Sequence, residues 1–145
     1  MKRSPELRDL SEDHHHGLVL ARKAKRAGSR EGDLSVSEVW AEAEARFRAE
    51  LDPHFGIEEA FIGAALERLG ETKLAGRLYE EHASLRKFFV PEAGRGPADL
   101  SRFGELLEKH IRFEERELFA VAQRVLPPGA LDAVANACQA RRRGR

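Results

Sequence analysis

The sequence has 145 residues, 41% of them hydrophobic, which is enough to build one hydrophobic core of ordinary size. Lysine plus arginine and aspartate plus glutamate both number 25, so no net charge favours nucleic acid or an anionic membrane surface. No apolar run approaches the roughly 18 residues that span a bilayer, and no apolar signal core follows the first residues, so we expect a cytoplasmic protein.

Apolar residues recur at helical spacing in four long stretches, separated by short segments rich in Gly, Ser, Pro or Asp. The first predicted helix covers residues 5–27, because Pro5 suits a first helical turn and Gly28 ends the pattern. Its predicted inward face carries Leu7, Leu10, His14, Leu18 and Ala21.

The second predicted helix begins at Val36, with Ser35 as its N-cap and Glu38 as the capping-box partner, and stops at Gly70. Pro53 lies inside this stretch, and we expect it to kink the helix without ending it, because the apolar stripe continues in phase. The predicted inward face consists of Val39, Trp40, Ala43, Phe47, Leu51, His54, Glu58, Ile62, Ala65 and Leu69. The other phenylalanines at helical spacing, Phe61 among them, are also predicted to be core residues.

Two more long helices are predicted over residues 71–90 and 98–125, each followed by proline. A short fifth helix should then run to about residue 140. Four long helices joined by short loops are typical of an all-α, up-down-up-down four-helix bundle.

We expect one domain over residues 1–145, with a core over about residues 5–126 and a short terminal helix and basic tail over residues 128–145. The terminal arginines, at 141–143 and 145, should form a solvated tail; a weak anion-binding arm is the alternative.

All six histidines fall on the four long predicted helices: three on the first, at positions 14 to 16, and one on each of the other three. In an antiparallel bundle, residues at similar distances from a shared loop meet at one level. By this count His14, His54, His82 and His110 share a level to within about four or five residues, the usual error of predicted helix boundaries. On the first helix His14 has the phase of the apolar face; His15 is the runner-up, and His16 should face solvent.

A short internal repeat adds two carboxylates to this level. His54-Phe55-Gly56-Ile57-Glu58-Glu59 resembles His110-Ile111-Arg112-Phe113-Glu114-Glu115. Helical residues four apart differ by about 40° in direction, so each histidine and its first glutamate aim at one point, while the second glutamate is turned about 140° away. We therefore select Glu58 and Glu114, and interpret Asp13 and Glu81, which precede histidines, as solvated.

These residues predict a metal site, although a lone histidine on an apolar face is usually a hydrogen-bonded core residue. Ionised carboxylates on apolar faces are costly unless paired, and four helices each place a histidine at one level. The predicted ligands are His14, His54, Glu58, His82, His110 and Glu114. Since Cys138 is the only cysteine, the donors are nitrogen and oxygen; two bridging carboxylates favour two iron ions, with zinc or manganese as alternatives. Tyr79 is predicted to be a core residue, with an outer hydrogen bond to the site as the alternative.

The sequence resembles the hemerythrin-like family of cation-binding domains with His-His-Glu motifs. The resemblance extends over Leu10 to His15, the two His-x-x-x-Glu-Glu segments and the Glu81-His82 pair. It implies a four-helix bundle with a non-haem di-iron centre that binds oxygen or related small molecules. In oxygen-carrying hemerythrins the third helix supplies two histidines one turn apart, but here Leu78 stands one turn before His82. In those proteins the fourth helix supplies an aspartate five residues after its histidine, whereas Glu114 comes four after His110.

This sequence is therefore more similar to a divergent branch with two His-x-x-x-Glu pairs, whose members are linked to iron sensing, nitric oxide response and repair of iron centres. We expect a metal-binding protein whose di-iron centre binds or senses O2, nitric oxide or peroxide, or which handles iron. The alternatives are an enzyme that turns over peroxide or nitric oxide with the same centre, and a structural or partner-binding bundle. The sequence identifies no protein partner.

Overall fold

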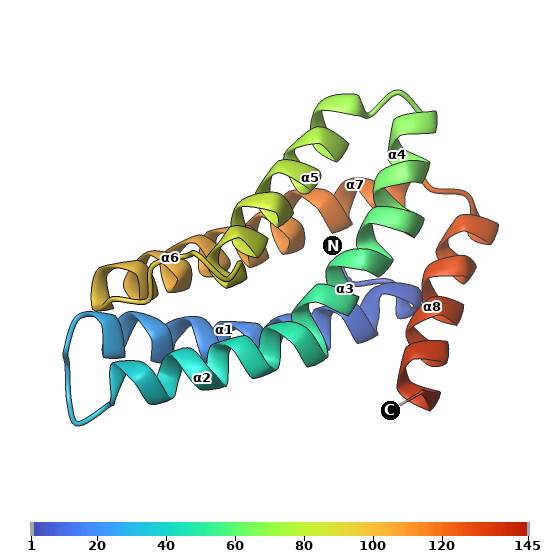
Figure 1. Cartoon of the computed structure of the whole chain (residues 1–145). Helices are drawn as coiled ribbons and strands as arrows, with labels where there is room; N and C mark the ends of the chain where they lie inside the picture. Colours follow the sequence, from blue (N-terminus) through green and yellow to red (C-terminus); the bar gives the residue numbers. More distant parts are fainter. Residues whose placement is uncertain (1, 145) are drawn as a thin grey trace.

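A computed structural model describes residues 2–144, and within this range every regular element is helical. Four long helical stretches form the bundle, and a fifth helix, α8, packs beside it (Figure 1). The all-α helical bundle predicted from the sequence is thus confirmed. Within residues 2–144 there is no helix both long and apolar enough to span a bilayer.

The first two stretches begin where the sequence predicts. The first consists of η1 (Pro5–Leu7) and α1 (Arg8–Gly28). The second consists of α2 (Val36–Arg46), η2 (Phe47–Leu51), α3 (Asp52–Ile57), η3 (Glu58–Gly63) and α4 (Ala64–Arg68). The side chain of Ser35 accepts a hydrogen bond from the backbone N–H of Glu38, so the predicted N-cap is present.

The helix continues through Pro53, as predicted, and Figure 1 shows it bending between α2 and α3. The bend coincides with η2, a π-helical segment in which the Asp52 N–H donates to the Phe47 carbonyl, one residue further back than in an α-helix. Proline has no N–H to donate, so a local change of hydrogen-bonding pattern accommodates it.

A second π-helical segment, η3, begins at Glu58 and changes which residues face inward. Beyond this point Ile62 and Ala65 are buried as predicted, but the prediction for Leu69 is wrong. Leu69, predicted inward, is 49% exposed, whereas Leu66 is fully buried. Phe61, predicted in the core, is 37% exposed. A π turn contains one extra residue, which rotates everything after it by about 100° relative to an unbroken α-helix.

The remaining stretches complete the bundle. The third consists of α5 (Thr72–Arg86) and η4 (Lys87–Phe89), and the fourth of α6 (Pro97–Phe113), η5 (Glu114–Leu118) and α7 (Phe119–Val125), with α8 (Pro128–Arg143) last. The segment η5 is again π-helical and begins at Glu114.

Helix α8 is longer than predicted and includes most of the basic tail. The side chain of Arg141 is only 13% exposed, and donates to Asp13 and to the backbone carbonyl of Glu50. The prediction of a solvated tail is therefore wrong for Arg141, because an ion pair with α1 holds it. Arg145 lies outside the described residues.

Helices α1 and α6 pack against each other at very close range, because glycine allows their backbones to approach. A Cβ on Gly104 would lie 2.6 Å from the Ala21 carbonyl oxygen, and one on Gly28 would lie 2.5 Å from the Ser101 nitrogen. This contact fixes the relative positions of the helices that carry His14 and His110.

The core comprises two apolar clusters. One contains Leu20, Ala24, Trp40, Phe47, Phe89 and Phe103, and the other contains Leu7, Leu10, Ile62, Leu66, Leu78 and Phe119. Polar side chains belong to neither cluster, and a layer of them lies at the middle of the bundle.

Candidate metal centre

The structure brings all six predicted ligands together in this polar layer. They come from the four long stretches: His14 from α1, His54 from α3, Glu58 from η3, His82 from α5, His110 from α6 and Glu114 from η5. None is more than 5% exposed, and together they are the buried polar or charged residues of the described chain. Burying so many ionisable groups is costly unless they bind one another or a cation.

The six side chains form two groups that share their carboxylates. Within each group, one potential ligand atom per residue lies within 4.8 Å of all the others. The first group is His14, His54, Glu58 and Glu114; the second is Glu58, His82, His110 and Glu114. The geometry therefore provides two adjacent positions for metal ions.

Each shared carboxylate turns one oxygen toward each group. Glu58 places Oε2 3.0 Å from His54 Nε2 and Oε1 3.1 Å from His82 Nε2. Glu114 places Oε1 2.5 Å from His14 Nε2 and Oε2 2.7 Å from His110 Nε2. Each of these carboxylates can therefore offer one oxygen to each group.

Several of these buried atoms have no hydrogen-bond partner among the described residues. Both carboxylate oxygens of Glu58 and Nε2 of His110 are in this state. Although His110 Nε2 lies close to Glu114 Oε2, the contact lacks the directionality of a hydrogen bond. Buried acceptors that converge without donors fit a bound cation, so the residues present suit a metal pair.

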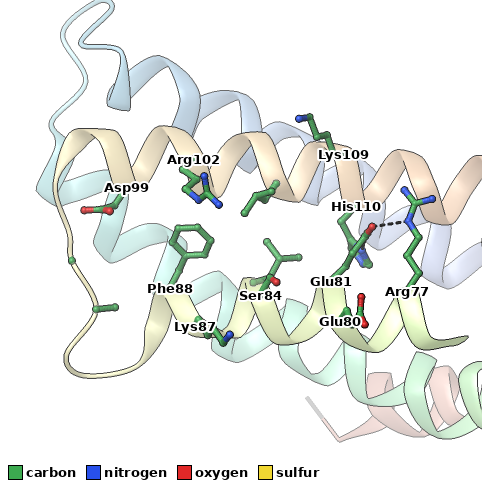
Figure 2. A pocket seen from close by; sticks show the side chains of 14 residues that line it. Arg77, Glu80, Glu81, Ser84, Lys87, Phe88, Asp99, Arg102, Lys109 and His110 are labelled. Atoms are coloured by element: carbon green, nitrogen blue, oxygen red, sulfur yellow. Dashed lines mark hydrogen bonds and ion pairs between the residues drawn. The ribbon is translucent and has the colours of Figure 1, made fainter. Parts of the chain in front are cut away.

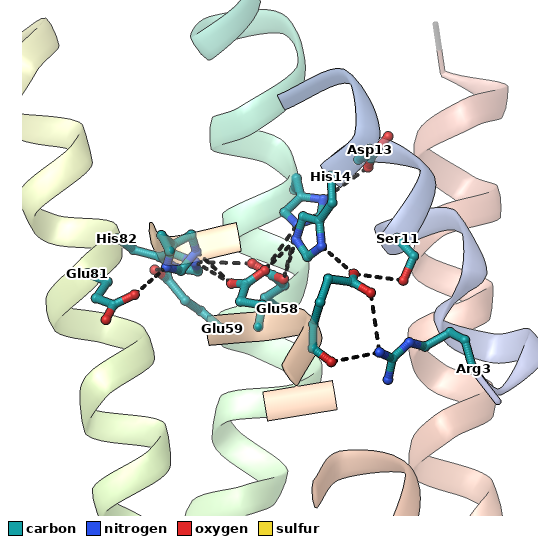
Figure 3. Close-up of polar contacts among 12 residues, drawn as sticks. Arg3, Ser11, Asp13, His14, Glu58, Glu59, Glu81 and His82 are labelled. Atoms are coloured by element: carbon teal, nitrogen blue, oxygen red, sulfur yellow. Dashed lines mark hydrogen bonds and ion pairs between the residues drawn. The ribbon is translucent and has the colours of Figure 1, made fainter. Parts of the chain in front are cut away.

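The opposite ring nitrogen of each of the four buried histidines contacts a second carboxylate (Figure 3). The Nδ1 pairs are His14 with Glu115 at 2.6 Å, His54 with Asp13 at 3.0 Å, His82 with Glu59 at 2.8 Å and His110 with Glu81 at 2.7 Å. We call Asp13, Glu59, Glu81 and Glu115 the outer carboxylates. The prediction that Asp13 and Glu81 are solvated is wrong. Glu59 and Glu115 belong to neither group of potential ligands, as predicted, but they contact the outer nitrogens of His82 and His14.

The physical reason for this error is that each outer carboxylate serves the neighbouring helix. A residue next to an inward ligand points about 100° away from it, along the interface with the next helix. Asp13 thus reaches from the first stretch to the second, Glu59 from the second to the third, Glu81 from the third to the fourth, and Glu115 from the fourth back to the first. The four bonds form a closed ring around the bundle.

These bonds determine which nitrogen of each neutral imidazole carries the proton and which one faces the site. An ionised carboxylate only accepts hydrogen bonds, so Nδ1 carries the proton and donates it. The lone pair of a neutral ring is then on Nε2, which faces the shared glutamates. The outer carboxylates thus orient four nitrogen donors toward the two positions.

An arginine binds each outer carboxylate in turn. The pairs are Arg141 with Asp13 at 2.8 Å, Arg86 with Glu59 at 2.7 Å, Arg77 with Glu81 at 2.8 Å and Arg3 with Glu115 at 3.2 Å. Burial would raise the pKa of Glu59, but hydrogen bonds from His82 and Arg86 lower it to about 2. The outer carboxylates are therefore held in the ionised form that accepts from histidine.

Without a metal, the excess of carboxylates makes the histidines hold protons. Burial by itself would lower the pKa of His82, but Glu114, Glu58 and Glu59 raise it to about 10. Burial would also lower the pKa of His110, but the negative charge of Glu114 and the hydrogen bond to Glu81 raise it to about 9. The site is thus suited to positive charge, supplied by protons or by metal ions.

Two aromatic rings that were not predicted to be part of the site also line it. Phe55 stacks on His82 with ring centroids 3.9 Å apart, and Phe119 stacks on His14 at 5.2 Å. Phe55 is adjacent to His54, so the internal repeat already placed it near this level. These rings keep water away from the imidazoles and hold them in orientation.

The other polar candidates lie outside the site. His15 and His16 are exposed, which supports the choice of His14. Tyr79 is partly buried and packs against the second apolar cluster, and its hydroxyl donates to Glu67 on α4 at 2.5 Å. No hydrogen bond from Tyr79 to the site is observed among the described residues.

A surface groove of about 680 Å³ runs between α5 and α6 and reaches the back of the site (Figure 2). Phe88 and Arg102 line one part of it, and Glu81 and His110 line another part, near Arg77 (Figure 2). The outer side of the His110–Glu81 pair is thus the part of the site nearest to this groove.

A family model of the hemerythrin HHE cation binding domain matches residues 6–122. The chain belongs to this family. No curated protein and no solved structure matches the chain. All six buried residues and all four outer carboxylates of this hemerythrin HHE domain fall inside the match, whereas Arg3 and α8 lie outside it. The family and the two His/Glu groups together indicate a metal-binding helical protein.

Proposed function

We propose that this hemerythrin HHE domain holds a non-haem di-iron centre that binds O2, nitric oxide or peroxide, and acts as a sensor, scavenger or iron reservoir. The observation that supports it is the pair of four-residue groups that share Glu58 and Glu114. Two carboxylates that each face both groups match the bridging glutamates of di-iron helical bundles.

The donor set narrows the choice of metal. Imidazole nitrogen and carboxylate oxygen suit iron, manganese and zinc, and no thiolate is present among the six residues. Each ion would receive two imidazoles and a share of two carboxylates, which leaves coordination positions free for a small external ligand. When bound, an iron pair supplies redox chemistry and a place for such a ligand. The protein's own residues orient the imidazoles, keep the site dry and keep a proton on each Nδ1, which donates it to an ionised outer carboxylate.

Metal analysis and spectroscopy of the whole chain test this proposal. Protein purified without chelator, or loaded anaerobically with Fe(II), should contain close to two irons per chain and change its visible spectrum when O2, nitric oxide or peroxide is added. A reproducible stoichiometry of one ion, or an iron pair whose spectrum none of these molecules changes, would contradict it.

The same preparation distinguishes the alternatives. Steady consumption of peroxide or nitric oxide by the loaded protein would identify an enzyme, whereas a single spectral change per centre indicates binding. Failure to bind any metal at pH 7 would support a purely structural bundle.

A further inference from the structure

The two metal positions differ in where their outer support comes from. At the His82–His110 position, the arginines that hold the outer carboxylates are Arg86 and Arg77, both on α5 inside the bundle. At the His14–His54 position they are Arg3 and Arg141, from the segments that flank the four long stretches. Both flanking arginines lie outside the family match, and both α5 arginines lie inside it.

The N-terminal flanking segment is fastened to the fourth stretch next to Glu115. Arg3 Nη2 donates to the side chain of Glu115 at 3.2 Å and to its backbone carbonyl at 2.7 Å. The Ser4 N–H donates to Gln123 at 3.1 Å. These bonds bind the segment to the carboxylate that orients His14.

Helix α8 is fastened to the helices that carry His14 and His54. It packs against η1, α1, α3 and η3, and Figure 3 shows it beside α1, on the side of the site away from α5. Arg141 Nη1 donates to Asp13 at 2.8 Å, and Nη2 donates to the Glu50 carbonyl at 3.1 Å. A polar cavity of about 380 Å³ adjoins this contact, lined in part by Asp13, His16 and Arg141.

Loss of the flanking-segment arginines and loss of the α5 arginines would require different changes in the fold. The flanking segments can detach without breaking any of the four long stretches, and such partial opening costs less than global unfolding. Detachment would remove the arginine from Asp13 and from Glu115, although Glu115 also accepts a hydrogen bond from Ser11, and would thereby weaken the support of His54 and His14. Arg77 and Arg86 are residues of α5, so their backbone stays beside the site as long as α5 stays in the bundle.

We propose, on the basis of the proposed metal pair, that docking of the flanking segments controls occupation of the His14–His54 position, while the His82–His110 position fills independently of them. Because such coupling is reciprocal, a metal ion at the His14–His54 position also holds the flanking segments in place. The two ions should therefore bind in order, with the His82–His110 position filled first.

Hydrogen exchange during metal titration tests this on the unaltered chain. With Co(II) as the probe, the first equivalent should leave amide exchange in α8 nearly unchanged, and the second should slow it. Exchange in α8 that slows in proportion to the first equivalent, or that stays unchanged after two, would overturn the inference. A chain that binds no second ion at all would instead contradict the proposed function.

Arginine variants provide the matched comparison. Arg141→Gln and Arg3→Gln should each lower the affinity for one of the two Co(II) ions by about tenfold or more and leave the other ion tightly bound. A loss of this size is usual when a partner that orients a metal ligand is removed. In a chain that already carries His54→Ala, Arg141→Gln should not change the affinity for the remaining ion, whereas Arg86→Gln should. Equal weakening of both ions by Arg141→Gln, or an effect that persists in the His54→Ala chain, would overturn it.

Discussion

Glu81 on α5 accepts a hydrogen bond from Nδ1 of His110 on α6 at 2.7 Å, and both residues line the surface groove. Replacing this carboxylate by an amide removes the charge that holds the proton on Nδ1. We expect Glu81→Gln to weaken metal binding by about 10- to 100-fold, measured by competition with a chelator. The neighbouring Glu80 is exposed, so Glu80→Gln should leave the affinity unchanged, and an equal loss from both variants would refute the assignment.

Glu58 and Glu59 are adjacent but have different roles, and their variants should differ in kind. Glu58 faces both metal positions, so Glu58→Gln should disturb both ions and weaken the magnetic coupling between them. Glu59 orients only His82, so Glu59→Gln should lower affinity by about tenfold and leave the coupling of the loaded pair intact. Metal content and low-temperature magnetic susceptibility measure these two effects, and loss of coupling in Glu59→Gln would contradict the bridging role of Glu58.

Protons and metal ions should compete for the site. In the metal-free chain the pKa of His82 is about 10 and that of His110 about 9, above the value of 6.5 expected on unfolding. The stability that these histidines contribute is complete below pH 6.5 and is lost as the pH rises through 9 to 10. Burial would raise the pKa of Glu114, but the charges of His110 and His14 lower it well below the ordinary value of 4.5. The stability that ionised Glu114 contributes is therefore complete above pH 4.5 and is lost as the pH falls below that value.

Thermal melts and calorimetry check this competition. Metal-free protein should melt at a lower temperature at pH 9 than at pH 6, whereas metal affinity should rise over the same interval because the bound imidazoles must be deprotonated. Loading at pH 7 should release protons, seen as a dependence of the binding heat on the ionisation enthalpy of the buffer. A metal-free melting temperature that rises from pH 6 to pH 9 would contradict the proposed proton occupancy.

Glycine at the α1–α6 contact should be essential for stability. A Cβ on Gly104 would lie 2.6 Å from the Ala21 carbonyl oxygen, so Gly104→Ala must push the two backbones apart. We expect a loss of about 1–3 kcal/mol in the free energy of unfolding, the usual cost of overpacking. Gly76 on α5 has open space at its Cβ, so Gly76→Ala should stabilise the chain by roughly 0.5–1 kcal/mol. Urea unfolding measures both, and equal effects would contradict the packing described.

The sequence predicts the helices and the six buried side chains well because both depend on periodicity along one helix. His14, His54 and His82 share the phase of the apolar residues around them, and a His-x-x-x-Glu spacing aligns each glutamate with its histidine. The same argument favours His14 over His15, and His15 is exposed in the structure. Phase is a local property, so one sequence is sufficient to read it.

The outer carboxylates and arginines depend on the register between neighbouring helices, which the sequence does not give. Asp13 appears solvated when only its own helix is considered, and it becomes a partner of His54 only after α1 and α3 are placed side by side. Arg141 becomes part of the site only when α8 docks. The π-helical segments were missed for a related reason, because one extra residue in a turn leaves no compositional signal.

Those π-helical segments limit how this centre can be transplanted. Glu58 and Glu114 each stand at the first residue of one, so the stretch after each carboxylate is rotated relative to the stretch before it. If the ligand spacings were copied onto straight α-helices, the metal layer would be reproduced while Leu66 was turned toward solvent and Leu69 inward. A designed bundle that borrows this site must therefore either keep the widened turn or remove one residue beyond each glutamate and rebuild the core below it.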